Sequence, residues 1–350
     1  MAKYDSRVIA RVLQYVQHLG DLNPRIIGAL SGVRNAEEIL GNLRNLYGLN
    51  PLARWEALGL DYFYIEMKAN PKISLLDLYN VMDGHLVLIA RNDRYPERIK
   101  SLFYFPTGIE FQSLFEKMVD NYIISEYSIH KMKKIMYYAM DFSELDFVSL
   151  RFKKSIVDYP RDPLELPNIS DGFKPDWLDL FIIGKKQEIN TISLKEIAKL
   201  AGVPYRNALY HYQKHVIGKG LVRGNAFRIK DLQNIRVILT FGKNEEVIKD
   251  LSKILTLSYA FETSDNKVIA NVYCDDYFLG DVLDYISYTM WKHKHNIDVS
   301  VHAFLPRFKY LLTASIPYEH YDKHGKWVVN KGLISEKIDS LSKKIELLQF

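Results

Sequence analysis

The stretch Ile27-Gly28-Ala29-Leu30-Ser31-Gly32-Val33 returns as Ile197-Ala198-Lys199-Leu200-Ala201-Gly202-Val203, 170 positions later in the chain of 350 residues. Each copy predicts a short helix that ends at a Gly-Val turn, because glycine adopts the left-handed backbone that a tight turn needs. A second helix follows each turn, so both copies predict a helix-turn-helix. A period this long indicates a duplicated module and not a solenoid repeat.

The second copy carries the clearer signals of a DNA-reading unit. Ser193 and Glu196 have the spacing of a capping box, and Pro204 suits the first position of the next helix. That helix, over 205–217, presents arginine and asparagine, which can pair with base edges. Residues 220–229 then predict a wing of two short strands around a Gly-Asn turn. The predicted DNA contacts of this unit are Tyr205, Arg206, Asn207, Tyr210, His211 and Lys214, with Arg223 and Arg228 on the wing for phosphates.

Charge is concentrated around this second unit. The formal net charge of the whole chain is only +5, but residues 185–230 hold ten Lys/Arg against two acids. Such a cluster is typical of phosphate binding, and a solvated basic face is the alternative. His211 and His215 have the spacing of a metal pair, but no acidic residue accompanies them in an HExxH arrangement. We therefore expect these two histidines to contact phosphate or solvent, and we predict no metal.

The first copy carries weaker signals of DNA binding. Asn23-Pro24 and Arg34-Asn35 begin its second and third helices, and Arg34, Asn35 and Arg44 are its predicted DNA contacts. The acidic pair Glu37-Glu38 suits the positive end of a helix but opposes a phosphate backbone. This unit could bind DNA modestly or could serve contacts with protein.

Each helix-turn-helix leads into the same succession of strands and helices. The order βαββαβ is that of a ferredoxin-like domain. The first set is predicted at 62–68, 74–82, 85–92, 99–105, 109–122 and 126–132, and the second at 235–241, 245–255, 259–263, 268–273, 278–293 and 297–304. The fold class is therefore α+β, with two winged helix-turn-helix units that each precede a ferredoxin-like βαββαβ domain.

The domain organisation follows from these elements and from a proline-rich stretch without periodicity. We predict a first winged helix-turn-helix over 1–60, a ferredoxin-like domain over 61–157, and a linker over 158–175. A second winged helix-turn-helix over 176–231, a second ferredoxin-like domain over 232–331 and a final helix over 332–350 complete the chain. The apolar stripe of that helix predicts packing on its own domain or an oligomer contact.

A winged helix-turn-helix followed by a βαββαβ domain resembles the leucine-responsive (Lrp/AsnC-type) transcription regulators. The segment 55–63, Trp-Glu-Ala-Leu-Gly-Leu-Asp-Tyr-Phe, is similar to their junction between wing and effector domain. The resemblance implies dimerisation through the sheets and a small-molecule effector at subunit interfaces. This chain departs from the pattern, because it is a tandem fusion and because segments 92–95 and 264–267 lack the Gly-Asp loop found in many members. We therefore assign no effector residues.

Composition excludes several classes of protein. Cys274 is the single cysteine, so an intrachain disulfide and a cysteine-rich zinc site are excluded. The sequence contains neither an apolar run long enough to span a bilayer nor the apolar core of a signal peptide, so we expect a cytoplasmic protein without a membrane partner. Few Gln and many Ile, Lys and Tyr hint at a thermophilic or archaeal source. Phosphate-loop, dinucleotide, HExxH and GxSxG motifs are absent, so we predict no enzyme activity and no cofactor.

The sequence thus predicts a transcription regulator that binds double-stranded DNA at an imperfect two-fold site. Its two recognition helices differ, which is why the site should not be a true palindrome. A small-molecule effector and a homodimer through the ferredoxin-like sheets are further partners that the pattern allows. The main alternative is a protein-interaction or architectural module, and an enzyme built on the ferredoxin-like halves ranks last.

Overall fold

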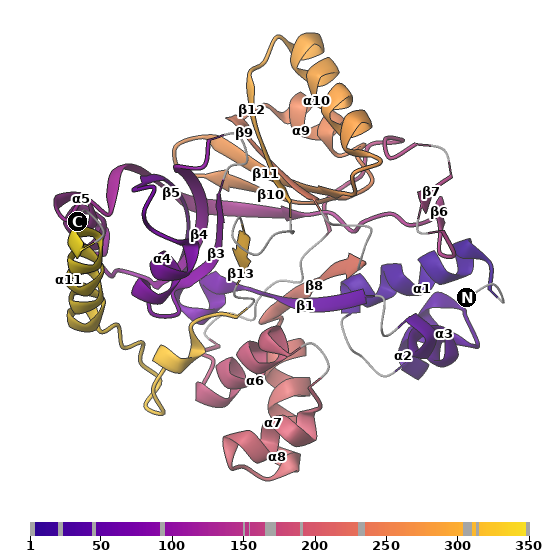
Figure 1. The fold of residues 1–350 in the computed structure, drawn as a ribbon. Coiled ribbons are helices and arrows are strands. Elements are labelled where there is room, and N and C mark those ends of the chain that lie inside the picture. The colour runs from indigo at the N-terminus through magenta and orange to yellow at the C-terminus, as the bar shows by residue number, and fades with distance from the viewer. Residues whose placement is uncertain are drawn as a thin grey trace. The chain divides into compact units, whose positions relative to one another are not determined.

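The computed structural model describes residues 4–19, 24–43, 47–91, 95–149, 151–153, 155–164, 173–189, 192–229, 235–303, 310–312 and 315–347. The chain forms two compact units (Figure 1). Unit 1 comprises Met1–Leu52, Lys133–Leu166 and Arg223–Val301, and unit 2 comprises Ala53–Met132, Pro167–Val222 and His302–Phe350. Each unit therefore combines the helix-turn-helix of one copy with the βαββαβ elements of the other. The predicted domain boundaries along the chain remain predictions.

Unit 1 begins with the first helix-turn-helix. Its helices are α1 (Ser6–Leu19), α2 (Pro24–Ser31) and α3 (Ala36–Leu43). Gly32 adopts a φ of 68° in the turn between α2 and α3, as the Gly-Val pattern predicts. One side of each helix is buried, including Val12, Ile27 and Ile39. These side chains join the core that also lies beneath the sheet of this unit.

The second βαββαβ set follows in unit 1 and confirms the predicted order. Its elements are β9 (Ile235–Gly242), α9 (Glu245–Leu251), β10 (Leu257–Thr263), β11 (Lys267–Cys274), α10 (Leu279–His293) and β12 (Ile297–Ala303). The strands lie in the order β12-β9-β11-β10, and the later residues of β5 (Ile124–Tyr137) extend the sheet beside β10. Tyr138 continues this edge by donating its backbone N–H to the Ser258 carbonyl at 2.8 Å.

Unit 2 holds the first βαββαβ set. After η1 (Trp55–Leu58) come β2 (Leu60–Ala69), α4 (Leu75–Val81), β3 (Leu86–Arg91), β4 (Arg98–Pro106), α5 (Gln112–Asp120) and the first residues of β5. The strands lie in the order β5-β2-β4-β3-β13, with β13 (Tyr310–Leu312) as an extra edge strand antiparallel to β3. Each ferredoxin-like sheet thus gains one edge strand: the later residues of β5 join the sheet of unit 1, and β13 joins the sheet of unit 2.

The second helix-turn-helix belongs to unit 2. It consists of α6 (Trp177–Glu188), α7 (Leu194–Ala201), α8 (Tyr205–Tyr210) and a π-helical segment η2 (His211–Ile217). The capping box of Ser193 and Glu196 is confirmed, and Gly202 ends α7 with a φ of 66°. The predicted helix over 205–217 is therefore present, but its second half has π-helical geometry that the sequence did not indicate.

The predicted hairpin of the second wing is wrong. Residues Val222–Ile229 form one continuous strand, β8, which pairs with β1 (Tyr47–Ala53) instead of folding back on itself (Figure 1). Gly224, expected in the turn, has a φ of 148° and lies against α1, where a Cβ would come within 2.9 Å of the Gln17 carbonyl oxygen. A long-range strand partner therefore replaces the local hairpin.

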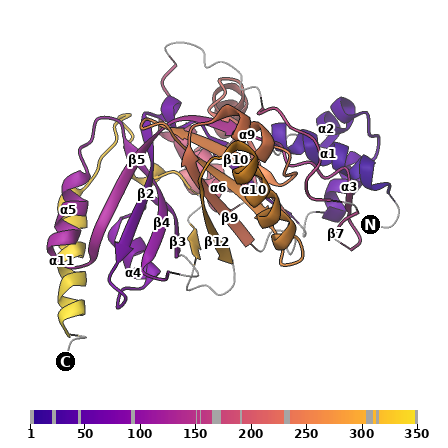
Figure 2. The same cartoon turned by 90° about the horizontal axis from the view of Figure 1, so that it is seen from above.

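The C-terminal helix α11 (Lys331–Leu347) packs on the sheet helices of unit 2. Its stripe Ile334, Ile338, Leu341 and Ile345 is buried in one core with residues of α4 and α5. Figure 2 shows α11 alongside α5. Ion pairs flank the contact, with Lys117 Nζ 2.7 Å from Asp339 Oδ1 and Lys344 Nζ 2.7 Å from Asp77 Oδ1. The stripe therefore packs within the chain, as predicted, but on the first ferredoxin-like set and not on the domain that precedes it in sequence.

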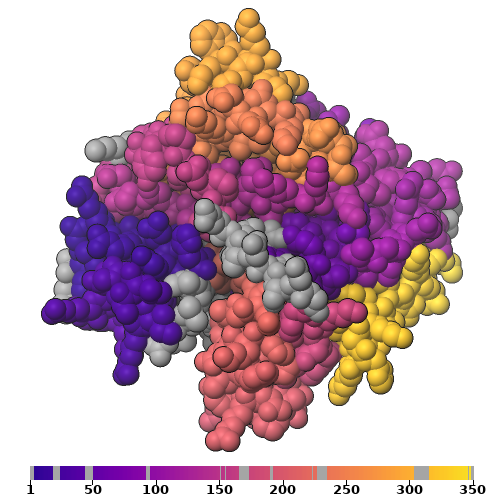
Figure 3. All heavy atoms as spheres, turned by 180° about the vertical axis from the view of Figure 1, so that it is seen from behind, coloured from indigo at the N-terminus to yellow at the C-terminus, as the bar shows by residue number. Residues whose placement is uncertain are grey.

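The segment before α11 lies against the second helix-turn-helix, as the yellow and magenta surfaces in Figure 3 illustrate. It includes η3 (Tyr318–His320), whose Tyr318 ring meets Phe181 of α6 edge-on at 5.6 Å. The Tyr321 hydroxyl donates to the Pro175 carbonyl at 3.0 Å. These contacts fix the position of α6 within unit 2.

Residues 158–164 of the predicted linker belong to unit 1, which also holds the short strands β6 (Leu145–Asp146) and β7 (Arg151–Phe152). The guanidinium of Arg161 anchors this segment by donating to the carbonyls of Ala139, Ser252, Ile254 and Leu257. Residues 165–172 lie outside the described residues. Among the described helices, none combines the length and the apolar character needed to cross a membrane.

Candidate functional site

Most residues predicted to read DNA in the second unit are exposed on α8 and η2. Tyr205 is 48% exposed and Tyr210 is 55% exposed, and Arg206, Asn207 and Lys214 are also at the surface. The side chains of Arg223 and Arg228 lie outside the described residues. Exposure alone is equally typical of a solvated helix face, so it does not distinguish a reader from a structural helix.

His211 does not face outward with the others. Its Nδ1 lies 2.9 Å from Asp179 Oδ1 of α6, and the His215 Nδ1 lies 3.0 Å from the same oxygen. Asp179 is fully buried, and this burial raises its pKa, although hydrogen bonds from Asp176 and His211 act in the opposite direction. The two imidazoles supply hydrogen bonds that a buried carboxylate needs, and the contact of His211 with DNA stays a prediction.

In the first unit the predicted contacts are scattered. Arg34 and Asn35 are exposed before α3, and Arg34 lines an open hollow of about 480 Å³ together with Arg25 and Glu37. Arg44 lies outside the described residues. At the described part of this helix-turn-helix, the structure therefore brings two arginines together with one acidic residue.

A different group of polar side chains is buried on the sheet of unit 1. Along β9 the odd positions, such as Val237 and Leu239, enter the core beneath α9 and α10, so the even positions face away from these helices. One of the even positions is Arg236, which is only 2% exposed. A nearly fully buried arginine is rare and needs polar partners.

The partners of Arg236 come from β10 and β11. Its Nε donates to Asn271 Oδ1 at 2.5 Å, and its Nη2 donates to the Tyr259 hydroxyl. The guanidinium carbon lies 5.6 Å from the Tyr259 ring and 5.8 Å from the Tyr273 ring. The cation is thus held in place by an amide and two phenol rings.

The sheet of unit 2 carries a similar buried polar face. Phe63, Ile65 and Met67 of β2 pack under the helices, so Tyr64 and Glu66 face away from them. The Tyr64 hydroxyl donates to Glu66 Oε1 at 2.8 Å, and the buried Lys100 Nζ lies 3.4 Å from that oxygen.

Aromatic rings surround this second polar face. The His130 ring of β5 stacks on Tyr64 with a centroid distance of 6.1 Å, and Tyr62 stacks on Tyr104 at 4.3 Å. His130 is 6% exposed and Tyr64 is 1% exposed. Buried imidazole, ammonium and phenol groups can hold a carboxylate and exchange a proton with it.

The two polar faces occupy equivalent places in the duplicated sheets. Glu66 and Arg236 hold the offset of 170, and their antiparallel neighbours across the sheet are Lys100 on β4 and Tyr273 on β11. Each face therefore holds a buried cation, on β4 in one copy and on β9 in the other. Sequence reasoning missed this feature because it searched for known catalytic motifs, although a lone arginine within the apolar stretch 235–241 was a usable signal.

Comparison with known proteins gives matches in structure only. No family model and no curated protein matches the chain. A crystal structure of the siroheme decarboxylase NirDL matches with a TM-score of 0.52 and 10% identity, covering 97% of this chain and 99% of that one. NirDL in complex with an iron-uroporphyrin III analogue matches with a TM-score of 0.50 and 10% identity, covering 98% and 100%. An AsnC family transcriptional regulator from Agrobacterium tumefaciens, 19% identical with a TM-score of 0.31, covers 41% of this chain and 98% of its own length.

The two NirDL matches bear out the predicted fold and overturn the predicted function. The chain has the duplicated fold with winged-helix and ferredoxin-like elements that resembles the Lrp/AsnC type. The predictions of a transcription regulator and of a protein without enzyme activity are contradicted, because the structures that match both copies together are those of a decarboxylase. Binding to double-stranded DNA is not supported either.

Proposed function

We propose that this chain is a decarboxylase whose substrate is an iron tetrapyrrole with carboxylate side chains. The observation that carries the proposal is the match of nearly the whole chain, in both copies, to siroheme decarboxylase NirDL, including its complex with an iron-uroporphyrin III analogue. The buried cations on both sheet faces give this chain groups that suit such a substrate.

Arg236 is the proposed carboxylate anchor of unit 1. A guanidinium recognises a carboxylate through two parallel N–H donors, and the attraction grows where water is excluded. Asn271 and Tyr259 hold the guanidinium through Nε and Nη2, so that its orientation is set before the substrate arrives. The rings of Tyr259 and Tyr273 add flat apolar surface suited to a macrocycle.

Lys100 is the equivalent cation of unit 2, and His130 is the proposed proton donor. Loss of CO2 from a side chain R–CH2–CO2⁻ breaks the carbon–carbon bond, and the electron pair left on R–CH2 takes up one proton to give R–CH3. Imidazole is the most common group for such a proton transfer. His130 lies next to Tyr64 on the same face as Lys100, which makes this face the place where binding and protonation can be combined.

The test is incubation of the purified chain with siroheme under anaerobic conditions, followed by mass spectrometry of the pigment. We expect products lighter by the mass of one or more CO2, and we expect Arg236→Gln to weaken siroheme binding in a spectroscopic titration. Exposed Arg34→Gln is the matched control and should bind like the wild type. Unchanged pigment, in a reaction where NirDL converts it, would refute the proposal.

A further inference from the structure

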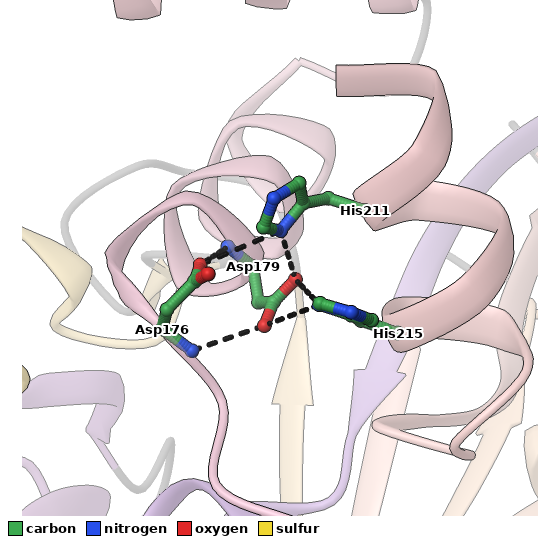
Figure 4. Close-up of side chains that lie close together, drawn as sticks. All are labelled: Asp176, Asp179, His211 and His215. Atoms are coloured by element: carbon green, nitrogen blue, oxygen red, sulfur yellow. Dashed lines mark hydrogen bonds and ion pairs between the residues drawn. The ribbon is translucent and has the colours of Figure 1, made fainter. Parts of the chain in front are cut away.

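Four potential metal ligands converge where η2 meets the start of α6 in unit 2 (Figure 4). They are Asp176, Asp179, His211 and His215, and one donor atom from each lies within 4.8 Å of the others. The His211 Nδ1 is 2.9 Å from Asp179 Oδ1 and 3.5 Å from Asp176 Oδ1. The His215 Nδ1 is 3.0 Å from Asp179 Oδ1.

This donor set matches a tetrahedral zinc site. Zinc binds imidazole nitrogen and carboxylate oxygen at about 2.0–2.2 Å, which places neighbouring donors of a tetrahedron about 3.3–3.5 Å apart. The separations of 2.9, 3.0 and 3.5 Å lie within a few tenths of an ångström of that value, and all four donor atoms lie within 4.8 Å of one another. The four side chains are therefore close enough together to share one ion.

The local backbone is also unusual at this point. The histidines lie in the π-helical segment His211–Ile217, directly after the ordinary helix α8. π-helical turns are rare and occur frequently at functional sites. Here both imidazoles of the segment point toward the same oxygen of the buried Asp179 carboxylate.

The surroundings hold the ligands in place and leave a way in. Tyr210 flanks both imidazoles, with ring centroids 5.9 Å from His211 and 5.3 Å from His215, and Phe173 lies 5.0 Å from His215. Asp179 is fully buried, whereas the Asp176 side chain is 54% exposed. Asp176 thus forms the entrance of the site, and the other three ligands form its floor.

We propose that Asp176, Asp179, His211 and His215 bind one divalent transition-metal ion, with zinc as the best fit to two nitrogen and two oxygen donors. All four donors come from the protein, which is the pattern of a structural site. The ion joins η2 to α6, so its role is to fix the second helix of the helix-turn-helix. None of the four ligands belongs to the polar sheet faces, so the inference does not depend on the proposed decarboxylase activity.

The test is a titration of the chelator-treated full-length chain with zinc alone, followed by calorimetry and by measurement of the melting temperature. We expect one zinc ion per chain and a rise in the melting temperature. Cobalt substituted for zinc should give the strong visible absorption of a tetrahedral site. Zinc that is not retained, or cobalt with the weak spectrum of an octahedral ion, would show that the cluster is only a hydrogen-bond network.

Asp176→Asn is the decisive variant, because asparagine caps a helix as well as aspartate but is a poor zinc ligand. We expect it to fold normally and to lower zinc affinity at least about tenfold. Glu196→Gln is the matched control, since it alters the capping box of α7 and removes one carboxylate outside the cluster. Equal zinc affinity in the wild type and in Asp176→Asn would overturn the assignment and attribute the binding to surface histidines.

Discussion

Gly184 in α6 lies against the ring of Tyr318, and the structure specifies the effect of adding one methyl group there. A Cβ on Gly184 would lie 2.0 Å from Tyr318 Cδ1 and 2.6 Å from Cγ, far inside normal contact. The ring has little room to retreat, because it is 3% exposed and its hydroxyl donates to Glu188 Oε1 at 2.6 Å. Gly184→Ala should therefore force α6 and η3 apart.

The expected magnitude is the sum of two opposing effects. Alanine is better than glycine inside a helix by about 1 kcal/mol. Overpacking a filled core costs about 1–3 kcal/mol. We therefore expect Gly184→Ala to lower the free energy of unfolding by up to about 2 kcal/mol. With the ring removed in Tyr318→Ala, the same substitution should instead stabilise by about 1 kcal/mol, because only the helix preference remains.

The assay is a double-mutant cycle by urea denaturation, followed by circular dichroism. Tyr318→Phe serves as the control, since it keeps the ring and so should preserve the cost of Gly184→Ala. A change of sign between the ring-bearing and ring-free backgrounds is the expected result. If Gly184→Ala has the same effect in all backgrounds, the packing of η3 on α6 described above is incorrect.

Three further predictions concern the core, the linker and a buried histidine. Ile338→Ala should lower the free energy of unfolding by about 2–5 kcal/mol, because Ile338 is fully buried in the contact of α11 with α4 and α5. Leu347→Ala at the exposed end of α11 is the control and should change the free energy of unfolding by less than about 0.5 kcal/mol. Similar losses for both variants would contradict the packing of α11. Arg161→Lys should lower the free energy of unfolding, measured by denaturant, by about 1–3 kcal/mol, because a lysine cannot reach all the carbonyls that this guanidinium binds. An unchanged free energy of unfolding would show that this segment is not anchored by Arg161. Burial lowers the pKa of His85 to about 4, assisted by the nearby His320, whereas the ordinary pKa of histidine is 6.5. Between pH 6.5 and about pH 4, unfolding therefore takes up a proton at His85, so the free energy of unfolding should fall as the pH falls through that window. His85→Phe should remove this part of the pH dependence, and an NMR titration of His85 near 6.5 would contradict the assignment.

The order of the elements could be predicted from sequence because it depends on local signals. The apolar stretch 235–241, the capping box of Ser193 and Glu196, and the glycines at 32 and 202 each act within a few residues. The structure confirms them. The constant offset of 170 positions between the two copies then predicted the duplication without any knowledge of contacts.

The partners of β8 and of Asp179 could not be predicted in the same way, because they are distant in sequence. Strand β8 contained a plausible hairpin turn, yet β1, more than 150 positions earlier, is its partner. The carboxylates of the cluster precede His211 by 32 residues or more, so a search for acids beside the histidines missed them. The Asp176–Asp179 spacing of a capping box was present but was not considered.

The function was mispredicted for a related reason. Motif searches recognise functional residues that are close in sequence, whereas the buried polar residues Glu66, Lys100 and His130 come from three different strands. The helix-turn-helix pattern and its basic surroundings were real, but a fold does not determine a function. Buried charge on a sheet face was the better indication of chemistry.

The most direct test of the decarboxylase proposal is a single-turnover reaction with the chain in excess over siroheme, in which released CO2 is measured against pigment mass. We expect stoichiometric CO2 from the wild type, with a matching loss of mass. We expect release at the wild-type level from Arg34→Gln and strongly reduced release from Arg236→Gln. Absence of CO2 from a folded wild-type chain that binds siroheme would contradict the decarboxylase assignment, and equal release from both variants would contradict the role of Arg236.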